Sequence, residues 1–279
     1  MTVVVRDPGV VWAGAKTHWV SAVAKSATCL SGGTTHLNVS DFSTALSTYL
    51  PANGDEQILF ERGETFFGSG GTFGFLPGYK KVLIEAYGSG AKPKIALSSG
   101  GSLLGAGCDQ ASADDFAPQD ARLMNINIEG SRARTISSGS DSDSSNRNLT
   151  YAARRSAFCG NTLGSVQDDG SEHVARMQGL ERNVIRRNHW TGPTAVHQMK
   201  AHVTGTDDEI YIGTEQFTII EGKLYERIDT GSPWSLGQEN GVAADGCDCR
   251  EYNKKMHVLG NLFHDETGSV NSGIEIHGD

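Results

Sequence analysis

Residues 171–203 carry a dense set of side chains that can bind anions and move protons. They are His173, Arg176, Arg182, Arg186, Arg187, His189, His197, Lys200 and His202. Arginine holds a permanent, forked charge that suits a carboxylate. A lysine or histidine can remove a proton when its surroundings lower its pKa. These residue types predict chemistry on an acidic substrate, in which a carboxylate is neutralised and a nearby proton is removed.

The end of this stretch reads as a strand with two different faces. Lys200 and His202 alternate with Met199, Ala201 and Val203, so the basic pair shares one face and the apolar residues share the other. If neighbouring strands repeat this arrangement, cationic side chains of successive strands line one outer wall. The alternative is ordinary: solvated outer faces and salt bridges between strands account for the same residues.

A repeating pattern predicts the elements that would position these residues. Four segments alternate apolar and polar residues and close on Gly or Asn, namely 123–130, 183–188, 217–222 and 256–261. Each predicts a strand, a tight bend and a second short strand, with Asn or Gly in the bend because both tolerate left-handed backbone angles. One such unit cannot bury its own apolar face, so stacking on its neighbours must supply the core.

The region before this repeat predicts one helix and two further strands. Asp41 can cap a helix whose apolar face comprises Phe42, Ala45, Leu46, Tyr49 and Leu50. The runs 58–60 and 82–84 are short, rich in strand-forming residues and bounded by Gly-containing turns.

These residues carry a family resemblance. The segment GDEQILFERGETF, followed by EAYGSGAKPKI, resembles the opening of the pectate-lyase-like superfamily of right-handed parallel β-helices. The resemblance implies an all-β fold, a right-handed parallel β-helix with a short N-terminal capping helix. It divides the chain into a strand-rich segment at 1–40 and one domain at 41–279. The chain stops within a predicted strand, so we expect further coils beyond Asp279 or a frayed end.

The resemblance also implies an activity. Proteins of the superfamily hold an extended polysaccharide in a groove on the outer strands, and some alginate and chondroitin lyases among them use a Lys/Arg pair assisted by calcium. By that similarity Lys200 is the base and Arg176 is a substrate-binding or acid group, with His202 and His173 as further catalytic candidates. The implied partner is an acidic extracellular polysaccharide, the implied reaction is β-elimination, and Ca²⁺ is a candidate cofactor.

Further side chains are candidates for substrate binding. Aromatic faces stack on sugar rings, and charged groups hold carboxylates and hydroxyls. The substrate-binding candidates are Arg187, His197, Trp190, Trp234, Glu239 and Asp245. Burial in the core is the competing interpretation for the tryptophans.

Two other functions stay open. A glycoside hydrolase would use two carboxylates, for which the candidates are Glu239, Asp245, Asp248, Asp265 and Glu275. Residues 240–248 resemble the Asp-bearing strand of polygalacturonases, but Ala244 stands where that motif has Thr. The third possibility is a carbohydrate-binding adhesin or a tailspike-like β-helix without turnover.

Composition limits the partners. A formal net charge of −9 argues against nucleic acid, and no apolar run approaches the ~20 residues that a membrane span needs. No signal peptide is visible, so the expected secreted or extracellular location requires a leader that this chain lacks. The oligomeric state stays open.

Three sequence features favour structural explanations. The five cysteines are odd in number and lack the spacing of a zinc site. The Gly-rich turns at 68–71 and 88–92 do not complete a phosphate loop. Residues 137–148 predict an exposed loop, in which Asp141 and Asp143 are weak calcium candidates without the pattern of an EF-hand.

Overall fold

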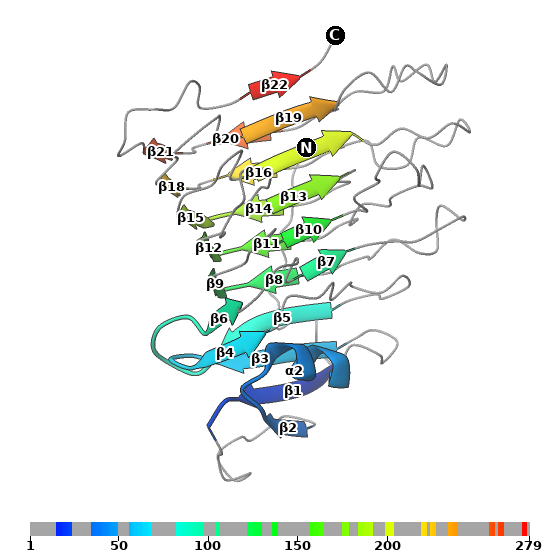
Figure 1. Ribbon diagram of the computed structural model, residues 1–279, viewed down its shortest axis with the longest axis vertical. Helices are drawn as coiled ribbons and strands as arrows, with labels where there is room; N and C mark the ends of the chain where they lie inside the picture. Colours follow the sequence, from blue (N-terminus) through cyan, green and yellow to red (C-terminus); the bar gives the residue numbers. More distant parts are fainter. Residues whose placement is uncertain are drawn as a thin grey trace, which may run out of the picture.

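The computed structural model of the chain consists of short parallel strands and one helix (Figure 1). The structure describes residues 15–23, 35–49, 56–68, 82–97, 104–106, 122–129, 136–138, 157–164, 175–178, 184–191, 199–203, 219–221, 224–226, 234–238, 257–259, 262–264 and 275–277. The prediction of a mostly β protein with one short helix is confirmed.

Three parallel sheets contain all the described strands. The nine-stranded first sheet has the order β2 (Thr35–Asn38), β1 (Lys16–Ser21), β3 (Glu56–Glu61), β5 (Val82–Tyr87), β8 (Arg122–Met124), β11 (Ala157–Cys159), β14 (Val184–Arg186), β17 (Ile219–Glu221) and β20 (His257–Leu259). The seven-stranded second sheet consists of β4 (Thr65–Gly68), β6 (Lys94–Leu97), β9 (Asn127–Glu129), β12 (Thr162–Gly164), β15 (His189–Thr191), β18 (Leu224–Glu226) and β21 (Leu262–His264). The six-stranded third sheet consists of β7 (Leu104–Ala106), β10 (Ile136–Ser138), β13 (Ala175–Gln178), β16 (Met199–Val203), β19 (Trp234–Gln238) and β22 (Glu275–His277).

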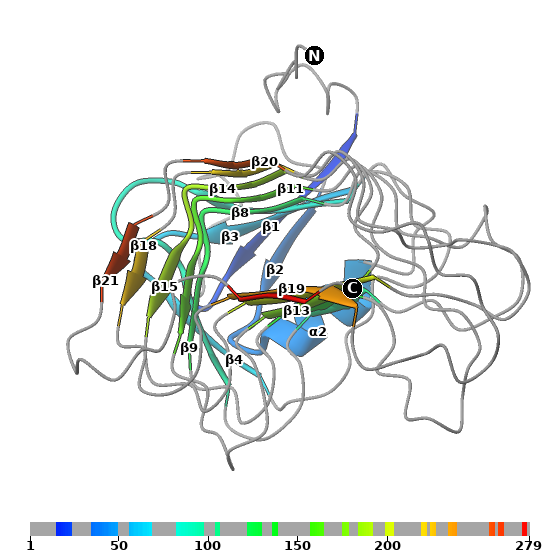
Figure 2. The same ribbon diagram turned by 90° about the horizontal axis from the view of Figure 1, so that it is seen from above.

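The chain visits the sheets in a fixed cycle. From β5 onward, each strand of the first sheet is followed by one of the second and then one of the third. Because neighbours within a sheet come from successive cycles, residues about 30 positions apart in the sequence lie side by side. Figure 2 shows the three sheets as separate walls when the stack is seen from above. We call one passage around the three sheets a rung.

Apolar columns run across the rungs on the core side. In the first sheet, Ile58, Ile84, Leu123, Phe158 and Ile185 hold one register position, and all are buried. A strand buries every second residue, so these columns follow from the alternation seen in the sequence. The predicted runs 58–60 and 82–84 lie in β3 and β5, which confirms both strands.

The helix α2 (Phe42–Tyr49) packs at the N-terminal end of the stack, against β3 and β4. Asp41 Oδ1 accepts a hydrogen bond from the Thr44 backbone N–H at 2.6 Å, as expected of an N-cap. The predicted apolar residues Phe42, Ala45, Leu46 and Tyr49 are buried, and Leu50 lies outside the described residues. Figure 2 shows α2 in line with the third sheet, in rungs where that sheet has no described strand.

The paired strands of all four predicted units are confirmed, and the bends of the units at 217–222 and 256–261 lie outside the described residues. Asn125 and Gly160 adopt left-handed backbone angles, with φ of 58° and 68°. In the segment 183–188 the left-handed residue is Arg187, with φ of 53°, rather than Asn188. Asn188 instead buries its amide between rungs, where it satisfies backbone groups. The sequence analysis also missed the unit at 157–164, which forms β11, a bend and β12.

Other predictions have mixed outcomes. Gly88 and Gly90 have φ of 81° and 110°, which confirms a structural turn at 88–92. Ser137 and Ser138 belong to β10, so the predicted loop at 137–148 was wrong at its start, and its remainder lies outside the described residues. Cys159 is the last residue of β11, and the other four cysteines lie outside the described residues. β1 and β2 join the first sheet below β3, while the proposed division at residue 40 stays a prediction.

Candidate functional site

The third sheet brings three of the predicted catalytic residues together. Arg176 in β13 pairs in register with Lys200 in β16, and Gln178 pairs with His202 in the same two strands. Neighbouring strands lie about 4.8 Å apart, and residues i and i+2 of one strand are about 6.6 Å apart. Arg176, Lys200 and His202 therefore occupy adjacent positions of one sheet face, although 24 residues separate the first two in sequence.

Further polar residues extend this face across the rungs. Paired positions in parallel strands belong to the same face of a sheet. The register continues from Ser137 through Arg176 and Lys200 to Ser235 and Glu275. A second column holds Gln178, His202, Gly237 and His277. We call the positions of these two columns the polar face of the third sheet.

Apolar residues occupy the alternate register positions. One predicted substrate-binding residue, Trp234, belongs to these positions and not to those of Arg176 and Lys200. Trp234 pairs in register with Met199, which alternates with Lys200 in β16. Trp234 therefore shares the register position of Met199 rather than that of Lys200.

The remaining predicted substrate-binding residues are elsewhere. Arg187 lies exposed in the bend between β14 and β15, which joins the first and second sheets. Trp190 in β15 holds the register position of Leu163 and of the buried Ile128, on the core-facing side of the second sheet. His173, His197, Glu239 and Asp245 lie outside the described residues.

The described residues contain neither a cluster of metal-binding side chains nor a helix that could span a membrane. In the part of the chain that the structure describes, no group of three or more His, Cys, Asp or Glu side chains could hold a metal ion. The calcium candidates Asp141 and Asp143 lie outside the described residues. None of the described helices has the length and apolar character that crossing a bilayer requires.

A second polar region, which the sequence analysis missed, lies where the first sheet turns into the second. Backbone hydrogen bonds connect the bends of successive rungs, including Gly63 to Ala91, Asn127 to Pro93, Thr162 to Ile126 and His189 to Asn161, at 2.8–3.0 Å. These bonds stack the bends into one continuous edge. Figure 1 shows the strands on either side of it rising in parallel columns, β8–β11–β14 and β9–β12–β15.

Glu85 occupies the first-sheet side of this edge. Its Oε1 accepts a hydrogen bond from Asn125 Nδ2 at 2.9 Å. Burial raises the pKa of the Glu85 carboxyl, while the Asn125 hydrogen bond and the charges of Arg62 and Arg122 oppose that shift. The net effect favours the protonated acid, a form that can donate a proton.

Lys92 and Arg62 bring two cations to the same edge. Lys92 Nζ donates a hydrogen bond to Thr162 Oγ1 in β12 at 3.1 Å, and Arg62 Nη1 contacts the Gly90 carbonyl oxygen at 3.5 Å. Burial lowers the pKa of Lys92, and the nearby Arg62 charge lowers it further. A lysine held beside a like charge is a site that an anion would stabilise.

Tyr87 is the last residue of β5 and pairs in register with Glu61 of β3. Its hydroxyl donates to Glu61 Oε2 at 3.0 Å, and its ring meets Trp19 edge-on at 4.6 Å between centroids. Burial raises the pKa of Tyr87, and the hydrogen bond and charge of Glu61 raise it further. Tyr87 is therefore a fixed hydrogen-bond donor rather than a base.

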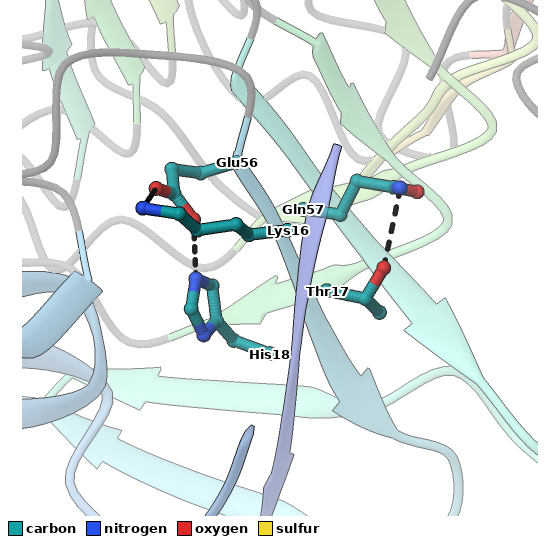
Figure 3. Close-up of polar contacts among 5 residues, drawn as sticks. All are labelled: Lys16, Thr17, His18, Glu56 and Gln57. Atoms are coloured by element: carbon teal, nitrogen blue, oxygen red, sulfur yellow. Dashed lines mark hydrogen bonds and ion pairs between the residues drawn. The ribbon is translucent and has the colours of Figure 1, made fainter. Parts of the chain in front are cut away.

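A buried polar cluster joins β1 to β3 near the helix (Figure 3). The His18 ring nitrogen Nε2 contacts Glu56 Oε2, and Lys16 Nζ lies 3.4 Å from Glu56 Oε1. The His18 ring also stacks on Tyr49 of α2 at 3.9 Å. Only 7% of the His18 side chain and 1% of the Glu56 side chain are exposed, so the cluster fastens the N-terminal rungs and is closed to a polymer.

The comparisons with known proteins leave the family open. No protein-family model matches the sequence, and no curated protein does. A solved structure, the GH136 lacto-N-biosidase from Eubacterium ramulus, is similar at 10% identity over 94% of this chain and 68% of that one, with a TM-score of 0.29. Similarity at this score carries no argument, so the function must be inferred from the chain itself.

A sequence signal for the missed edge exists in the repeats. When the units are aligned on their core residue Leu123, Phe158 or Ile185, the second and third following positions are always the bend. That alignment places Asn125, Gly160 and Arg187 in one column. Glu85, Arg62 and Lys92 lie in rungs with longer turns, and only the three-dimensional stacking brings them beside this column.

Proposed function

We propose that the three sheets are the walls of a right-handed parallel β-helix of the pectate-lyase-like kind, and that this protein cleaves an acidic polysaccharide by β-elimination on the polar face of its third sheet. The observation that carries the proposal is the register pair Arg176–Lys200. The fixed cycle of strands supports the β-helix, because it is the path of a chain that coils around three walls.

The chemistry divides between the two members of the pair. In a uronic acid, the proton next to the carboxylate becomes acidic when the carboxylate charge is neutralised, and the Arg176 guanidinium is suited to that task. Lys200, as the neutral amine, takes this C5 proton, and a neighbouring cation favours the neutral form of a lysine. The electron pair forms the C4–C5 double bond as the C4–O bond breaks.

The leaving sugar oxygen needs a proton to complete the reaction. His202 lies two positions after Lys200 on the same sheet face, about 6.6 Å along the strand. A histidine at that distance is suited to protonate the oxygen that departs from C4. Ser235 and Glu275 continue the face on the next rungs and are positioned to hydrogen-bond neighbouring sugar units.

The proposal is tested by the products formed from alginate, pectate and chondroitin. Elimination creates an unsaturated sugar end that absorbs ultraviolet light, so absorbance that grows with time supports a lyase. New reducing ends without absorbance would instead support a hydrolase, in which Glu275 could serve as one of two carboxylates. Retention on a polysaccharide gel with neither signal would indicate a binder.

Two substitutions at one position separate base catalysis from charge. Lys200→Ala removes both the amine and its charge and should lower turnover by at least about a hundredfold. Lys200→Arg keeps the charge but cannot act as a base, because a guanidinium does not lose its proton in proteins. We expect it to bind substrate and remain inactive. Turnover by Lys200→Arg near that of the unmodified protein would remove Lys200 as the base, provided that both variants unfold at the unmodified protein's midpoint.

A further inference from the structure

The bends between the first and second sheets carry cations that the proposed reaction does not use. We call Arg62, Lys92 and Arg187 the basic corner. They lie on the edge where backbone hydrogen bonds stack one bend on the next, while Arg176 and Lys200 belong to a different sheet. Figure 2 shows this edge, between β14 and β15 and between β8 and β9, on another side of the stack from β13 and β19.

The ammonium of Lys92 is held towards Arg187 by its hydrogen bond. Lys92 precedes β6, but its Nζ contacts Thr162 in β12, two strands further along the second sheet. The next strand of that sheet is β15, which follows the bend containing Arg187. Thr162, which holds the Lys92 ammonium, and the bend that contains Arg187 thus belong to adjacent rungs, which are spaced about 4.8 Å apart. Arg62 extends the row in the opposite direction, beside the Gly90 carbonyl.

The backbone at Arg187 is unfavourable for its residue type. The equivalent bend position is Asn125 in one rung and Gly160 in another, and both types tolerate left-handed angles. An arginine at φ of 53°, with an exposed side chain, gives up local stability to place a cation on this edge. A Cβ at Gly160 would lie 2.6 Å from Asn125 Oδ1, so glycine at this bend makes room for the asparagine of the neighbouring rung.

In the part of the chain that the structure describes, acidic partners for these cations are scarce. Within the described ranges, none of the three residues forms an ion pair with a carboxylate. The Arg62 charge acts on the carboxyl of Glu85, but burial raises the pKa of that carboxyl and so favours its neutral form. Burial lowers the pKa of Lys92, and the like charge of Arg62 lowers it further.

From this geometry we infer that the basic corner is a second binding track for an acidic polysaccharide, which lies across successive rungs with its carboxylates beside Arg62, Lys92 and Arg187. The inference rests on the proposed function for the substrate class. A straight row of separated cations suits a polymer with one charge per sugar unit. The chain's net charge of −9 opposes densely charged nucleic acid.

The test measures binding without cleavage, in the full chain carrying Lys200→Ala. The neutralised variant adds Arg62→Gln, Lys92→Met and Arg187→Gly, and its matched control carries Arg62→Lys, Lys92→Arg and Arg187→Lys. Glycine at 187 suits the left-handed angle, so the neutralised variant should stay folded. Unfolding midpoints of all three proteins check this.

Calorimetric titration with alginate oligosaccharides gives the readout. We expect the neutralised variant to bind at least about tenfold more weakly than its parent, and the charge-preserving control to bind within about twofold of it. Added salt should weaken the parent and barely affect the neutralised variant. Equal affinity of the parent and the neutralised variant would overturn the inference, as would tighter binding of a DNA duplex than of alginate.

Failure of this inference is distinct from failure of the proposed function. The first is read from binding to proteins that carry Lys200→Ala, and the second from unsaturated ends made by the unmodified protein. If the unmodified protein cleaves alginate but the neutralised variant binds as tightly as its parent, the lyase proposal is supported and the basic corner is not a binding track. If the unmodified protein makes no unsaturated ends but the neutralised variant loses binding, the basic corner is supported and the lyase proposal fails.

Discussion

Glu85 shows how the fold sets the charge of a single residue. Its carboxyl lies half-buried on the outer side of β5, and burial raises its pKa above the ordinary value of 4.5. Asn125, in the next rung, donates a hydrogen bond to this carboxyl. Since the folded-state pKa exceeds the unfolded one, the folded protein binds the proton more tightly. The associated stability is complete below pH 4.5 and is lost as the pH rises through the folded-state pKa.

Glu85→Gln should remove the loss of stability that accompanies rising pH. Glutamine is neutral at every pH and can still accept the Asn125 hydrogen bond. We expect the variant and the unmodified protein to unfold at similar denaturant concentrations at pH 4, and the variant to be the more stable at pH 7. Denaturant unfolding across this range measures the difference.

The companion variant Asn125→Gly tests the cause. Glycine keeps the left-handed bend but removes the amide that favours the charged carboxylate. The loss of stability with rising pH should become steeper than in the unmodified protein. Parallel pH profiles for all three proteins would show that Glu85 does not titrate as the structure implies.

At the level of elements, buried asparagines hold the bends together. Asn161 is fully buried, and its Oδ1 accepts from the Ile126 backbone N–H at 3.1 Å while its Nδ2 donates to the Leu123 carbonyl at 2.9 Å. Asn188 repeats the arrangement one rung on, donating to the Phe158 carbonyl at 2.8 Å and accepting from Asn161. Each amide satisfies backbone groups that a strand-to-strand ladder leaves open at the corner.

Asn161→Ala should therefore be strongly destabilising. It leaves a buried N–H and a buried carbonyl without partners, at about 1–3 kcal/mol each, so we expect a loss of about 3 kcal/mol in the free energy of unfolding. Asn38→Ala is the matched control, because Asn38 is exposed although its Oδ1 accepts a hydrogen bond from Ser21 Oγ at 2.9 Å, and it should cost about 1 kcal/mol. Denaturant unfolding compares the two, and similar losses would rule out a special role for the buried amide.

The strands could be predicted from the sequence, but the roles of the bends could not. Alternation in 58–60, 82–84 and 123–130 reflects a local rule, that a strand buries every second residue. Asn188 looked like a turn residue, because turns are the common reason for an asparagine after a strand. Its burial depends on the rung stacked beneath it. The same limit hid Glu85 and Lys92, whose surroundings come from residues 40 and 70 positions away.

Part of the candidate site could likewise be predicted from the sequence, and part could not. Lys200 and His202 share a strand, so their common face could be predicted. That Arg176 is the register partner of Lys200 depends on the length of the chain between the two strands. Trp190, Trp234 and Arg187 were grouped with them on chemistry alone. The register assigns each to a different face or edge, because a face is set by odd and even positions along a strand.

The whole molecule is a stack in which each described strand pairs only with strands of the neighbouring rungs. Val184 takes the same register position in the first sheet as Ala157, one rung earlier, and His189 takes that of Thr162 in the second. Met199 takes that of Ala175 in the third sheet. Neighbouring rungs are therefore interchangeable in backbone position, as in repeat proteins whose stability is a sum over units and their interfaces.

Removing a whole rung should leave a folded protein. Deletion of residues 157–183 joins the chain so that β14, β15 and β16 follow β10 and take the places of β11, β12 and β13. Ile185 then meets Leu123 in the core column, and Asn188 takes the place of Asn161 beneath the Ile126 N–H. We expect a β-sheet circular dichroism spectrum and one cooperative unfolding transition, with lyase turnover lost because Arg176 is deleted.

A shorter deletion gives the contrasting case. Removing residues 157–174 brings β13 into the first sheet in place of β11, so that Arg176 takes the register position of Phe158. Phe158 is 3% exposed, and an unpaired arginine buried there would cost several kcal/mol, which is comparable with the whole stability of a domain. This variant should fail to unfold cooperatively although it loses fewer residues. Equal folding of the two deletions would contradict the register that puts residue 158 in the core column, and with it the stacked register that places Arg176 beside Lys200.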